Sequence, residues 1–391
     1  MKVLQVCKKS PTPQRDGESI AIHQITKALV TQGNTVDVLA MLTTKHPSYD
    51  SQSELEGVNY QYIPVITPIS SKEAFFSIFG SIPYIIERFQ SERFESALLK
   101  KLQATHYDVI IFEGIFLSLY LDLIKKNSKA KLVLRAHNIE NKIWKRQVKF
   151  ELNYFKKAFL YLVMNRQFEQ FEVEMMQKYD GILSISPVDN QYFTNNKASK
   201  TLVIPVCVDA TSKSSLPEGF HVGFLGGMDW VPNVQGVVWF VENVWLQFVK
   251  EYPDVQFNLA GRNFPSDIAA WQHPGIKVHG EIADAEQFIR SQSLIISPIF
   301  SGSGMRVKII EAMSYGKCVL STSIGAEGIR CQDKENILIA DTASTYLETL
   351  CALYCERRAL QRIGEQAVQL VQKEYSLKEH AKKMHVFLQA L

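Results

Sequence analysis

The segment 298–311 combines residue types that suit the binding of an anion. Its loop consists of small residues, Ser301, Gly302, Ser303 and Gly304. We expect a strand before this loop and a helix after it, so that backbone N–H groups of the loop form a cradle. The N-terminus of the helix adds roughly half a positive charge to that cradle. This combination predicts a site for phosphate groups.

Three charged residues follow the loop and refine this prediction. Arg306 and Lys308 lie at the expected start of the helix, where cations oppose the helix dipole and destabilise an empty helix. An anionic ligand explains their presence better than the alternative, a solvated helix start with an exposed arginine and lysine. Glu311, about two turns along, is placed to accept hydrogen bonds from the diol of a ribose.

A second loop with a glycine follows the first expected strand. It runs from Ser10 to Ser19 and contains Gly17, which lets a backbone approach a ligand closely. The helix that begins near Ser19 directs its unpaired N–H groups at the same space. The alternative is an ordinary strand-to-helix loop with a capping serine, and this loop alone does not decide between them.

Two further polar positions follow strands in the first half of the chain. His137 comes two residues after a strand that ends at Arg135, and Glu113 and Gly114 end another strand. Ligands of open parallel sheets bind beyond the carboxyl ends of the strands. We therefore expect His137 to contact a ligand; a purely structural histidine is the alternative. Glu113 and Gly114 either line the same ligand site or form a turn.

The elements that must position these residues alternate between short strands and amphipathic helices. This pattern is typical of α/β proteins with parallel sheets. The alternation pauses around Pro205, in a stretch rich in Ser, Pro and Gly, and then starts again. We therefore expect two Rossmann-like domains, residues 1–208 and 209–375, and a C-terminal helix, residues 376–391, that packs back on the first domain.

The composition excludes several classes of protein. The chain has 391 residues with 43 Lys and Arg against 40 Asp and Glu, a net charge of +3, which gives no basis for nucleic acid binding. Its six cysteines show no C-x-x-C pair, so we expect no metal site and a reducing compartment. The first apolar run is too short for a signal peptide, and we expect a cytoplasmic protein.

Several stretches together resemble glycosyltransferase family 4, a retaining family of the group 1 glycosyl transferases. The main one is SGSGMRVKIIEAMSYGKCVLSTSIGAEGI, from Ser301 to Ile329. The supporting stretches occur in the order of the family; they are Leu132–Trp144, His221–Phe240, Val255–Arg262 and Ile276–Asp284. The resemblance implies the GT-B fold, in which two Rossmann-like domains face each other across a cleft, and a nucleotide-sugar donor.

The resemblance also implies roles for single residues near the donor. Glu311 matches the second glutamate of the family motif, which holds the donor ribose, whereas the position of the first glutamate is Ser303. The Arg and Lys pair that the family places after the first strand of the C-terminal domain is replaced by Gly and Pro in GGMDWVPN. We infer that Arg306 and Lys308 take over the diphosphate, so that both act in catalysis.

Other positions follow from the same match. Gly17 corresponds to the N-terminal glycine that approaches the donor phosphates, and His137 to a histidine near the transferred sugar. The match implies that His137 binds a sugar hydroxyl group rather than acting as an essential base. Glu113 and Gly114 then either line the acceptor side or form a turn. Gly261, Arg262 and Ile282 border the nucleobase and ribose, mainly through their backbone. No Asp-x-Asp occurs in the chain, so we expect catalysis without a metal ion or other cofactor, the donor being a substrate.

These observations predict a glycosyltransferase that moves a sugar from a nucleoside diphosphate sugar to a glycan or lipid-linked acceptor. Two alternatives remain open at this point. One is a nucleotide-sugar 2-epimerase, which also uses two Rossmann-like halves. The other is a non-catalytic subunit that binds nucleotide sugars, since Ser303 stands in place of a motif glutamate.

Two segments of the first half predict a peripheral contact with the inner face of a membrane. The segment 75–85 is dense in aromatic and aliphatic residues, and the segment 144–159 interleaves aromatic residues with Lys and Arg. Such a mixture suits an anionic membrane that carries lipid-linked acceptors. The alternative is a packed amphipathic helix with a solvated basic face.

Overall fold

The structure of the chain, a computed structural model, divides into two compact units. It describes residues 1–14, 16–68, 70, 77, 80, 82–150, 154, 161, 167–208, 210, 216–302 and 304–391. Unit 1 comprises Met1–Cys207 and Leu377–Leu391, and unit 2 comprises Val208–Ser376. These limits lie one residue from the boundaries expected after residues 208 and 375.

Unit 1 contains a parallel sheet that, in the described residues, has seven strands in the order β3-β2-β1-β4-β5-β6-β7. The strands are β1 (Lys2–Cys7), β2 (Thr35–Thr43), β3 (Asn59–Val65), β4 (Val109–Glu113), β5 (Lys131–Ala136), β6 (Gly181–Ser184) and β7 (Thr201–Val203). The order reverses direction between β1 and β4, and ligands of open parallel sheets bind beside such a point, at the carboxyl edge.

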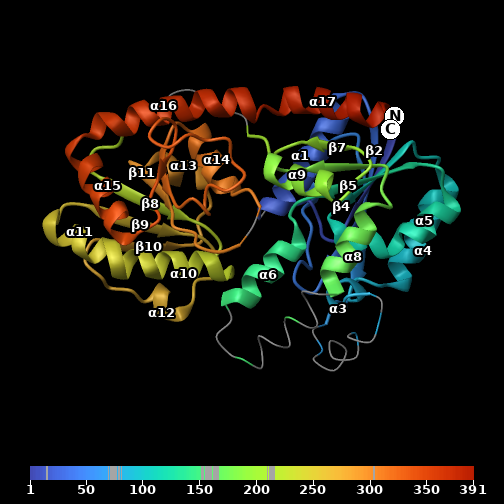
Figure 1. Cartoon of the computed structure of the whole chain (residues 1–391), viewed down its shortest axis with the longest axis horizontal. Coiled ribbons are helices and arrows are strands. Elements are labelled where there is room, and N and C mark those ends of the chain that lie inside the picture. Colours follow the sequence, from blue (N-terminus) through green and yellow to red (C-terminus); the bar gives the residue numbers. More distant parts are fainter. Residues whose placement is uncertain are drawn as a thin grey trace. The chain divides into compact units, whose positions relative to one another are not determined.

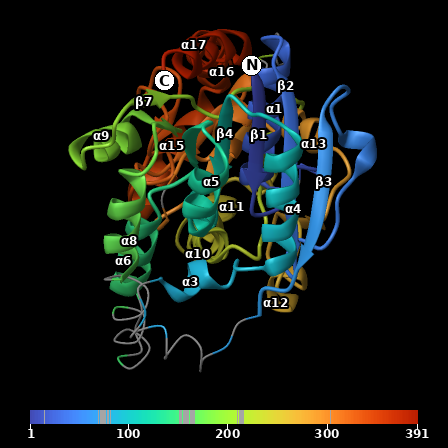
Figure 2. The same cartoon turned by 90° about the vertical axis from the view of Figure 1, so that its right-hand side faces the viewer.

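Helices cover both faces of this sheet because its strands are apolar on both sides. Leu4 and Val6 face the layer of α3 (Tyr84–Glu87), α4 (Glu92–Ala104), α5 (Leu121–Asn127) and α8 (Gln167–Met176). Val3 and Cys7 face α1 (Gly17–Thr31) and α17 (Leu377–Gln389). Figure 2 shows α4 and α5 in front of β1 and β4. The C-terminal helix α17 therefore completes the core of unit 1.

The remaining short elements of unit 1 connect these layers. They are η1 (Ser51–Ser53), η3 (Ile115–Tyr120), α6 (Glu140–Phe150) and α9 (Pro187–Asn195). Helix α6 begins beside a buried carboxylate: the backbone N–H of Glu140 donates to Oε1 of Glu172 over 2.8 Å. This bond satisfies one of the N–H groups that every helix leaves unpaired at its start.

Unit 2 contains a second parallel sheet, whose six strands within the described residues follow the order β10-β9-β8-β11-β12-β13. The strands are β8 (His221–Leu225), β9 (Gln256–Ala260), β10 (Ile276–Gly280), β11 (Leu294–Ser297), β12 (Cys318–Ser321) and β13 (Leu338–Ile339). Two Rossmann-like α/β sheets confirm the fold class expected from the sequence. The order reverses between β8 and β11.

Figure 1 shows α10 and α11 on one side of this sheet and α13 and α14 on the other. The helices are α10 (Val231–Phe240), α11 (Leu246–Glu251), α12 (Ser266–Ala269), α13 (Ala285–Arg290), α14 (Val307–Ser314), α15 (Ala343–Cys355) and α16 (Arg357–Glu374). The sequence predicts one helix over 233–250, but a π-helical turn, η5 (Val241–Trp245), separates α10 from α11. Trp245 is fully buried there and donates to the carbonyl of Pro274 over 3.0 Å.

Gly236 provides a test of how closely α10 packs on the end of β11. A Cβ atom at this position would lie 1.8 Å from the carbonyl oxygen of Pro298, which is backbone and has no room to move. We expect Gly236→Ala to lower the free energy of unfolding by about 1–3 kcal/mol, the usual cost of overpacking. Chemical denaturation of Gly236→Ala against Gln235→Ala, an exposed neighbour on the same helix, measures the difference. Equal stability of the two variants would show that α10 does not pack this closely.

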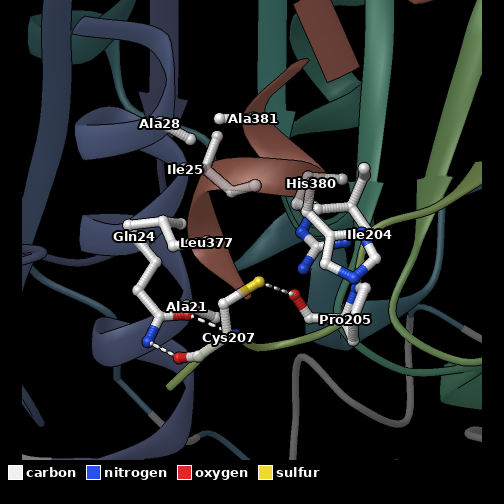
Figure 3. A pocket seen from close by; sticks show the side chains of 11 residues that line it. Ala21, Gln24, Ile25, Ala28, Ile204, Pro205, Cys207, Leu377, His380 and Ala381 are labelled. Carbon is white, nitrogen blue, oxygen red and sulfur yellow. Dashed lines mark hydrogen bonds between the residues drawn. The ribbon is translucent and has the colours of Figure 1, made fainter. Parts of the chain in front are cut away.

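A small cavity of about 10 Å³ lies in unit 1 between α1, α17 and the segment after β7. Figure 3 shows Gln24 of α1 bonded to Cys207, and the thiol of Cys207 donating to the carbonyl of Pro205 over 3.5 Å. A volume of this size holds about one water molecule. The cavity is therefore too small for a nucleotide or a sugar, and none of the predicted site residues lines it.

Candidate functional site

In unit 2, the loops that follow β8 and β11 flank the point where the strand order reverses. Residues 226–230 connect β8 to α10, and residues 298–306 connect β11 to α14. Gly236 of α10 packs against the backbone of Pro298, the first residue of the loop after β11. The loop after β11 therefore starts close to α10, the helix that follows the loop after β8. A ligand of an open parallel sheet binds at such a point. The small-residue loop identified in the sequence is one of these two.

The loop after β11 adopts the backbone that its glycines permit. Gly302 and Gly304 have φ angles of +101° and +82°, in the left-handed region that favours glycine. A Cβ atom on Gly302 would lie 3.0 Å from the indole of Trp230, which comes from the loop after β8. Ser303, predicted to bind the donor, lies outside the described residues. The loop is therefore shaped by its glycines and closed on one side by Trp230.

Arg306 forms the N-cap of α14 and lies against the same loop. Its guanidinium donates to the carbonyl of Gly304 and stands 5.4 Å from the ring centroid of Trp230, a cation–π arrangement. Only 6% of Arg306 is exposed. Because the side chain is held from two sides, its charge is fixed at the helix N-terminus, where the dipole adds to it.

Lys308 is the second residue of α14 and faces β8 and α10. Its Nζ donates to Oδ1 of Asn233 over 2.9 Å and stands 4.1 Å from the ring centroid of Phe224. Burial, and secondly the charge of Arg306, lower the pKa of Lys308 to about 7. No carboxylate pairs with Lys308 in the described part of the chain. An anion bound here would restore its full positive charge.

Glu311 is half-buried on α14, and its carboxylate is destabilised. Burial raises the pKa of Glu311, and the carboxylate of Glu286 on α13 raises it further. Hydrogen bonds from ligand hydroxyl groups would replace the lost water and stabilise the charged form. The position therefore suits the diol that the sequence predicts for it.

The other predicted donor contacts lie at the ends of β9 and β10. Gly261 has a φ angle of +149°, and a Cβ atom there would lie 1.9 Å from the carbonyl oxygen of Gly226. The backbone N–H of Gly261 donates to the carbonyl of Gly280 over 2.9 Å. Arg262 follows, with its Nε 3.8 Å from a carboxylate oxygen of Asp229. Backbone contacts thus tie the loops after β8, β9 and β10 together.

Ile282 follows β10 and is half-buried. Strand β10 is the edge strand and runs parallel to its neighbour β9, so Ile282 lies at the same end of the sheet as Gly261 and Arg262, which follow β9. The structure thus gathers Gly261, Arg262 and Ile282 at the carboxyl edge of one half of the sheet.

In unit 1, Gly17 is the exposed first residue of α1. The sequence suggests a capping serine at 19, but the N-cap is Asp16, whose carboxylate accepts from the backbone N–H of Ser19 over 2.9 Å. The hydroxyl group of Ser19 closes a capping box with the backbone N–H of Asp16. Gly17 itself carries no side chain into the loop.

Two lysines after β1 surround Glu18 of α1. Lys8 lies 3.1 Å from one carboxylate oxygen of Glu18, and Lys9 lies 3.1 Å from the other and 2.6 Å from Asp16. Burial alone would raise the pKa of Glu18, but the two lysines outweigh it and hold the pKa well below its ordinary value. This part of the edge is therefore a set of charges that neutralise one another.

His137 lies at the carboxyl edge of unit 1, as expected, and it is paired with Glu113. Nε2 of His137 lies 2.8 Å from Oε2 of Glu113, which ends the neighbouring strand β4. Glu113 is fully buried, so its side chain does not line an acceptor surface as one of the two sequence interpretations holds. Gly114, next in the chain, has a φ angle of +88° and forms a turn.

The two segments predicted to contact a membrane are only partly described. Of the first, Tyr84 and Ile85 are buried in the core of unit 1, which removes them from any surface. Trp144 of the second packs against the same core, and Lys145 pairs with Glu169 over 2.6 Å. Ile82 and Tyr154 of the same two segments are exposed, by 36% and 78%. The other residues on which this prediction depends lie outside the described residues or their described side chains; they are Phe75, Phe76, Ile78, Phe79, Arg146, Lys149, Phe150, Phe155, Lys156, Lys157 and Phe159. Within the described ranges, no helix has the length and apolar character to cross a membrane.

Two residues of the unit 2 site were not found from the sequence. Trp230 is 38% exposed and closes the glycine loop, and buried Asn233 links Lys308 to the carbonyl of Gly227, to which its Nδ2 donates over 2.7 Å. In the family match the stretch GGMDWVPN stands out only by the cation pair that it lacks, so its aromatic and amide side chains carry no prediction. A large aromatic residue beside a strand-end glycine pair is the signal that could have found Trp230.

Comparison with known proteins identifies relatives of both units. Residues 219–356, about a third of the chain, match the family model described as glycosyl transferases group 1. A protein of Klebsiella pneumoniae described as an uncharacterized 44.6 kDa protein in the cps region is 25% identical over 398 residues, 97% of each chain.

Solved structures share the fold at low sequence identity. Sucrose-phosphate synthase from Thermosynechococcus elongatus is 15% identical with a TM-score of 0.72, covering 100% of this chain and 99% of its own. HepE from Anabaena, solved with UDP-glucose, is 13% identical with a TM-score of 0.68, covering 100% of both chains. The pneumococcal O-GlcNAc transferase GtfA, solved with UDP and GlcNAc, is 13% identical with a TM-score of 0.69, covering 100% and 99%. These matches assign the GT-B fold to the chain.

Proposed function

We propose, from the membership of residues 219–356 in the glycosyl transferases group 1 family, that the chain moves a sugar from a nucleoside diphosphate sugar to a glycan or lipid-linked acceptor. The observation that carries this proposal is the anion site of unit 2. A glycine loop, the N-terminus of α14 and two basic side chains meet there, and Glu311 follows on the same helix. Diphosphate and ribose are the two groups that such a site suits.

The charges of this site fit the chemistry of sugar transfer. Breaking the bond between a sugar and a diphosphate develops negative charge on the leaving phosphate oxygens. Catalysis requires groups that bind this charge better in the transition state than before it. Arg306 is held in place by the Gly304 carbonyl and Trp230, so it need not reorganise during the reaction.

We further propose that transfer needs no metal ion and retains the configuration of the sugar. The cations of α14 would supply the charge that a metal supplies elsewhere. In the resembled family, the acceptor attacks from the same face as the leaving phosphate, which assists its deprotonation. Nuclear magnetic resonance of the product bond tests retention directly. Activity that survives EDTA is the expected result, and a strict requirement for Mg²⁺ would overturn the metal-free mechanism.

The acceptor that we propose is a growing polysaccharide or its lipid-linked precursor. The Klebsiella pneumoniae relative lies in a cps region, the region that encodes capsule formation. HepE and GtfA, which share the fold, were solved with UDP-glucose and with UDP and GlcNAc, which supports a UDP-sugar as the first donor to test. A cytoplasmic enzyme at the inner face of the membrane would meet such an acceptor.

A thermal-shift screen of nucleotide sugars tests the donor. A bound donor stabilises the folded state by mass action, by about 2.7 kcal/mol at 100 times the dissociation constant. We expect Glu311→Ala to raise the dissociation constant of the matching nucleotide sugar about 10- to 100-fold, since a buried ligand hydroxyl group would lose a charged hydrogen-bond partner. Glu348→Ala, on α15, is the control because it lies outside this site.

Two results would contradict the proposal. If no nucleotide sugar stabilises the protein, the donor site is not in this chain. If a nucleotide sugar is epimerised without an acceptor, the chain is an isomerase. Release of nucleoside diphosphate that depends on Arg306 and Glu311 would exclude a subunit that binds but does not react.

A further inference from the structure

A chain of buried hydrogen bonds in unit 1 ends at His137. The hydroxyl group of Thr26, on α1, donates to Oε1 of Gln5 over 2.7 Å. Nε2 of Gln5 then donates to Oε1 of Glu113 over 2.5 Å, and Oε2 of Glu113 lies 2.8 Å from Nε2 of His137. The four residues come from α1, β1, β4 and the end of β5. Nothing in the reaction described above uses Thr26, Gln5 or Glu113.

The direction of these bonds fixes the imidazole of His137. A carboxylate only accepts hydrogen bonds, and Gln5 already donates to one oxygen of Glu113. Gln5 cannot turn its amide over without cost, because its Nε2 also donates to the carbonyl of Ile22 over 3.3 Å. Nε2 of His137 must therefore carry the proton that is shared with Glu113. The neutral imidazole then has its lone pair on Nδ1.

Nδ1 of His137 is open to a ligand. It makes no hydrogen bond within the described residues, and it reaches solvent although only 8% of the residue is exposed. Gly114 leaves room beside the ring: a Cβ atom there would lie 3.9 Å from Cδ2 of His137 and 4.0 Å from Oε1 of Glu18. The ring therefore presents one acceptor atom at the carboxyl edge, next to the point where the strand order reverses.

Charges around the ring support the same orientation. Glu18 of α1 and Glu140 of α6 both lie near His137, and the charge of Lys8 acts on both acids. Lys8 and Lys9 are paired with Glu18, which leaves Glu113 as the carboxylate in direct contact with the ring. Because Glu113 is fully buried, it acts on a substrate only through His137.

We propose that Glu113 is a positioning residue that holds His137 with Nδ1 turned outward as the acceptor for a sugar hydroxyl group. This inference rests on the proposed function for the identity of the ligand, but the orientation itself does not. Gln5 and Thr26 fix Glu113 in turn. The hydroxyl group comes either from the transferred sugar or from the acceptor.

Nuclear magnetic resonance of ¹⁵N-labelled histidine tests the orientation without any ligand. The chain has nine histidines, and two-bond correlations distinguish Nε2–H from Nδ1–H in each of them. We expect the Nε2–H form for His137, assigned with His137→Gln. Glu113→Gln should shift His137 toward the Nδ1–H form: its single amide oxygen accepts from Gln5, so its NH2 group faces Nε2 of His137, which must then accept. An Nδ1–H form in the wild type, or no change in Glu113→Gln, would overturn the proposal.

A matched control separates orientation from general damage to unit 1. Asp37, near the start of β2, is also a buried carboxylate and accepts from the hydroxyl group of Tyr107 over 2.5 Å. We expect Asp37→Asn to lower the melting temperature while the His137 signals and the turnover of the donor stay unchanged. Glu113→Leu should lower kcat/KM about 10- to 100-fold, as the loss of a supporting hydrogen bond does at other sites.

Titration of the labelled wild type tests the ligand. UDP alone should leave the Nδ1 signal of His137 in place. A shift on adding the nucleotide sugar that binds assigns the hydroxyl group to the transferred sugar; a shift only with UDP plus free mono- or oligosaccharides assigns it to the acceptor. If the nucleotide sugar binds and neither addition moves Nδ1, the role of His137 is wrong while the proposed function stands. If no nucleotide sugar binds, the proposed function fails and the hydroxyl-binding role fails with it, but the tautomer result still decides the orientation.

Discussion

Arg306→Ala is expected to lower the turnover number for cleavage of the nucleotide sugar about 100- to 1000-fold. Removing one fixed donor that stabilises a developing oxyanion costs about 2.7–4 kcal/mol. Arg306 is such a donor because its guanidinium is bound by the carbonyl of Gly304 and faced by Trp230, at the N-terminus of α14. Release of nucleoside diphosphate, followed under saturating donor, measures the effect on turnover separately from the effect on binding.

The control for Arg306→Ala is Arg330→Ala in the same unit. Arg330 is 56% exposed along its side chain and pairs with Glu374 over 2.8 Å, away from the glycine loop. Arg330→Ala should change the turnover number by less than twofold. Arg306→Lys should keep part of the activity, because lysine retains the positive charge but lacks the planar guanidinium group. Unchanged turnover in a folded Arg306→Ala protein would remove Arg306 from catalysis.

Local sequence patterns predicted the elements that hold this arginine. The sequence predicts strands over 2–7 and 294–298. The first is β1 at its observed limits, and the second is β11, which ends one residue earlier than predicted. The glycines at 302 and 304 were expected to shape a loop, and both have the positive φ angles that other residues rarely adopt. Such features depend on residues within a few positions of one another, so they can be predicted from the sequence alone.

Contacts between distant segments were not predictable in the same way. Asn233 and Lys308 are 75 positions apart and meet only because β8 and β11 are neighbours in the sheet. Gln5 and Glu113, 108 positions apart, meet for the same reason in unit 1. Strand β13 has only two residues, too few for a period-two pattern. The turn η5 was missed because its residues suit an α-helix equally well.

The contact of Lys308 with Asn233 leads to a prediction about pH. Burial and the charge of Arg306 lower the pKa of Lys308 to about 7 in the empty protein. A diphosphate would raise that pKa, so binding above pH 7 requires uptake of a proton. We expect the dissociation constant of the nucleotide sugar to rise about 10- to 20-fold between pH 7 and pH 8.5, because the protonated fraction falls from about one half to about 3%. Below pH 6 the lysine is already charged, and binding should not change with pH.

Titration calorimetry in two buffers of different ionisation enthalpy measures the proton uptake together with the affinity. The diphosphate of a nucleotide sugar does not titrate in this range, which leaves the protein as the source of the dependence. Lys308→Arg is the decisive variant, because an arginine stays charged at every pH used. It should bind with an affinity independent of pH, and Lys277→Arg, an exposed lysine of β10, should keep the wild-type slope. If Lys308→Arg keeps that slope as well, another group takes up the proton and Lys308 does not face the diphosphate.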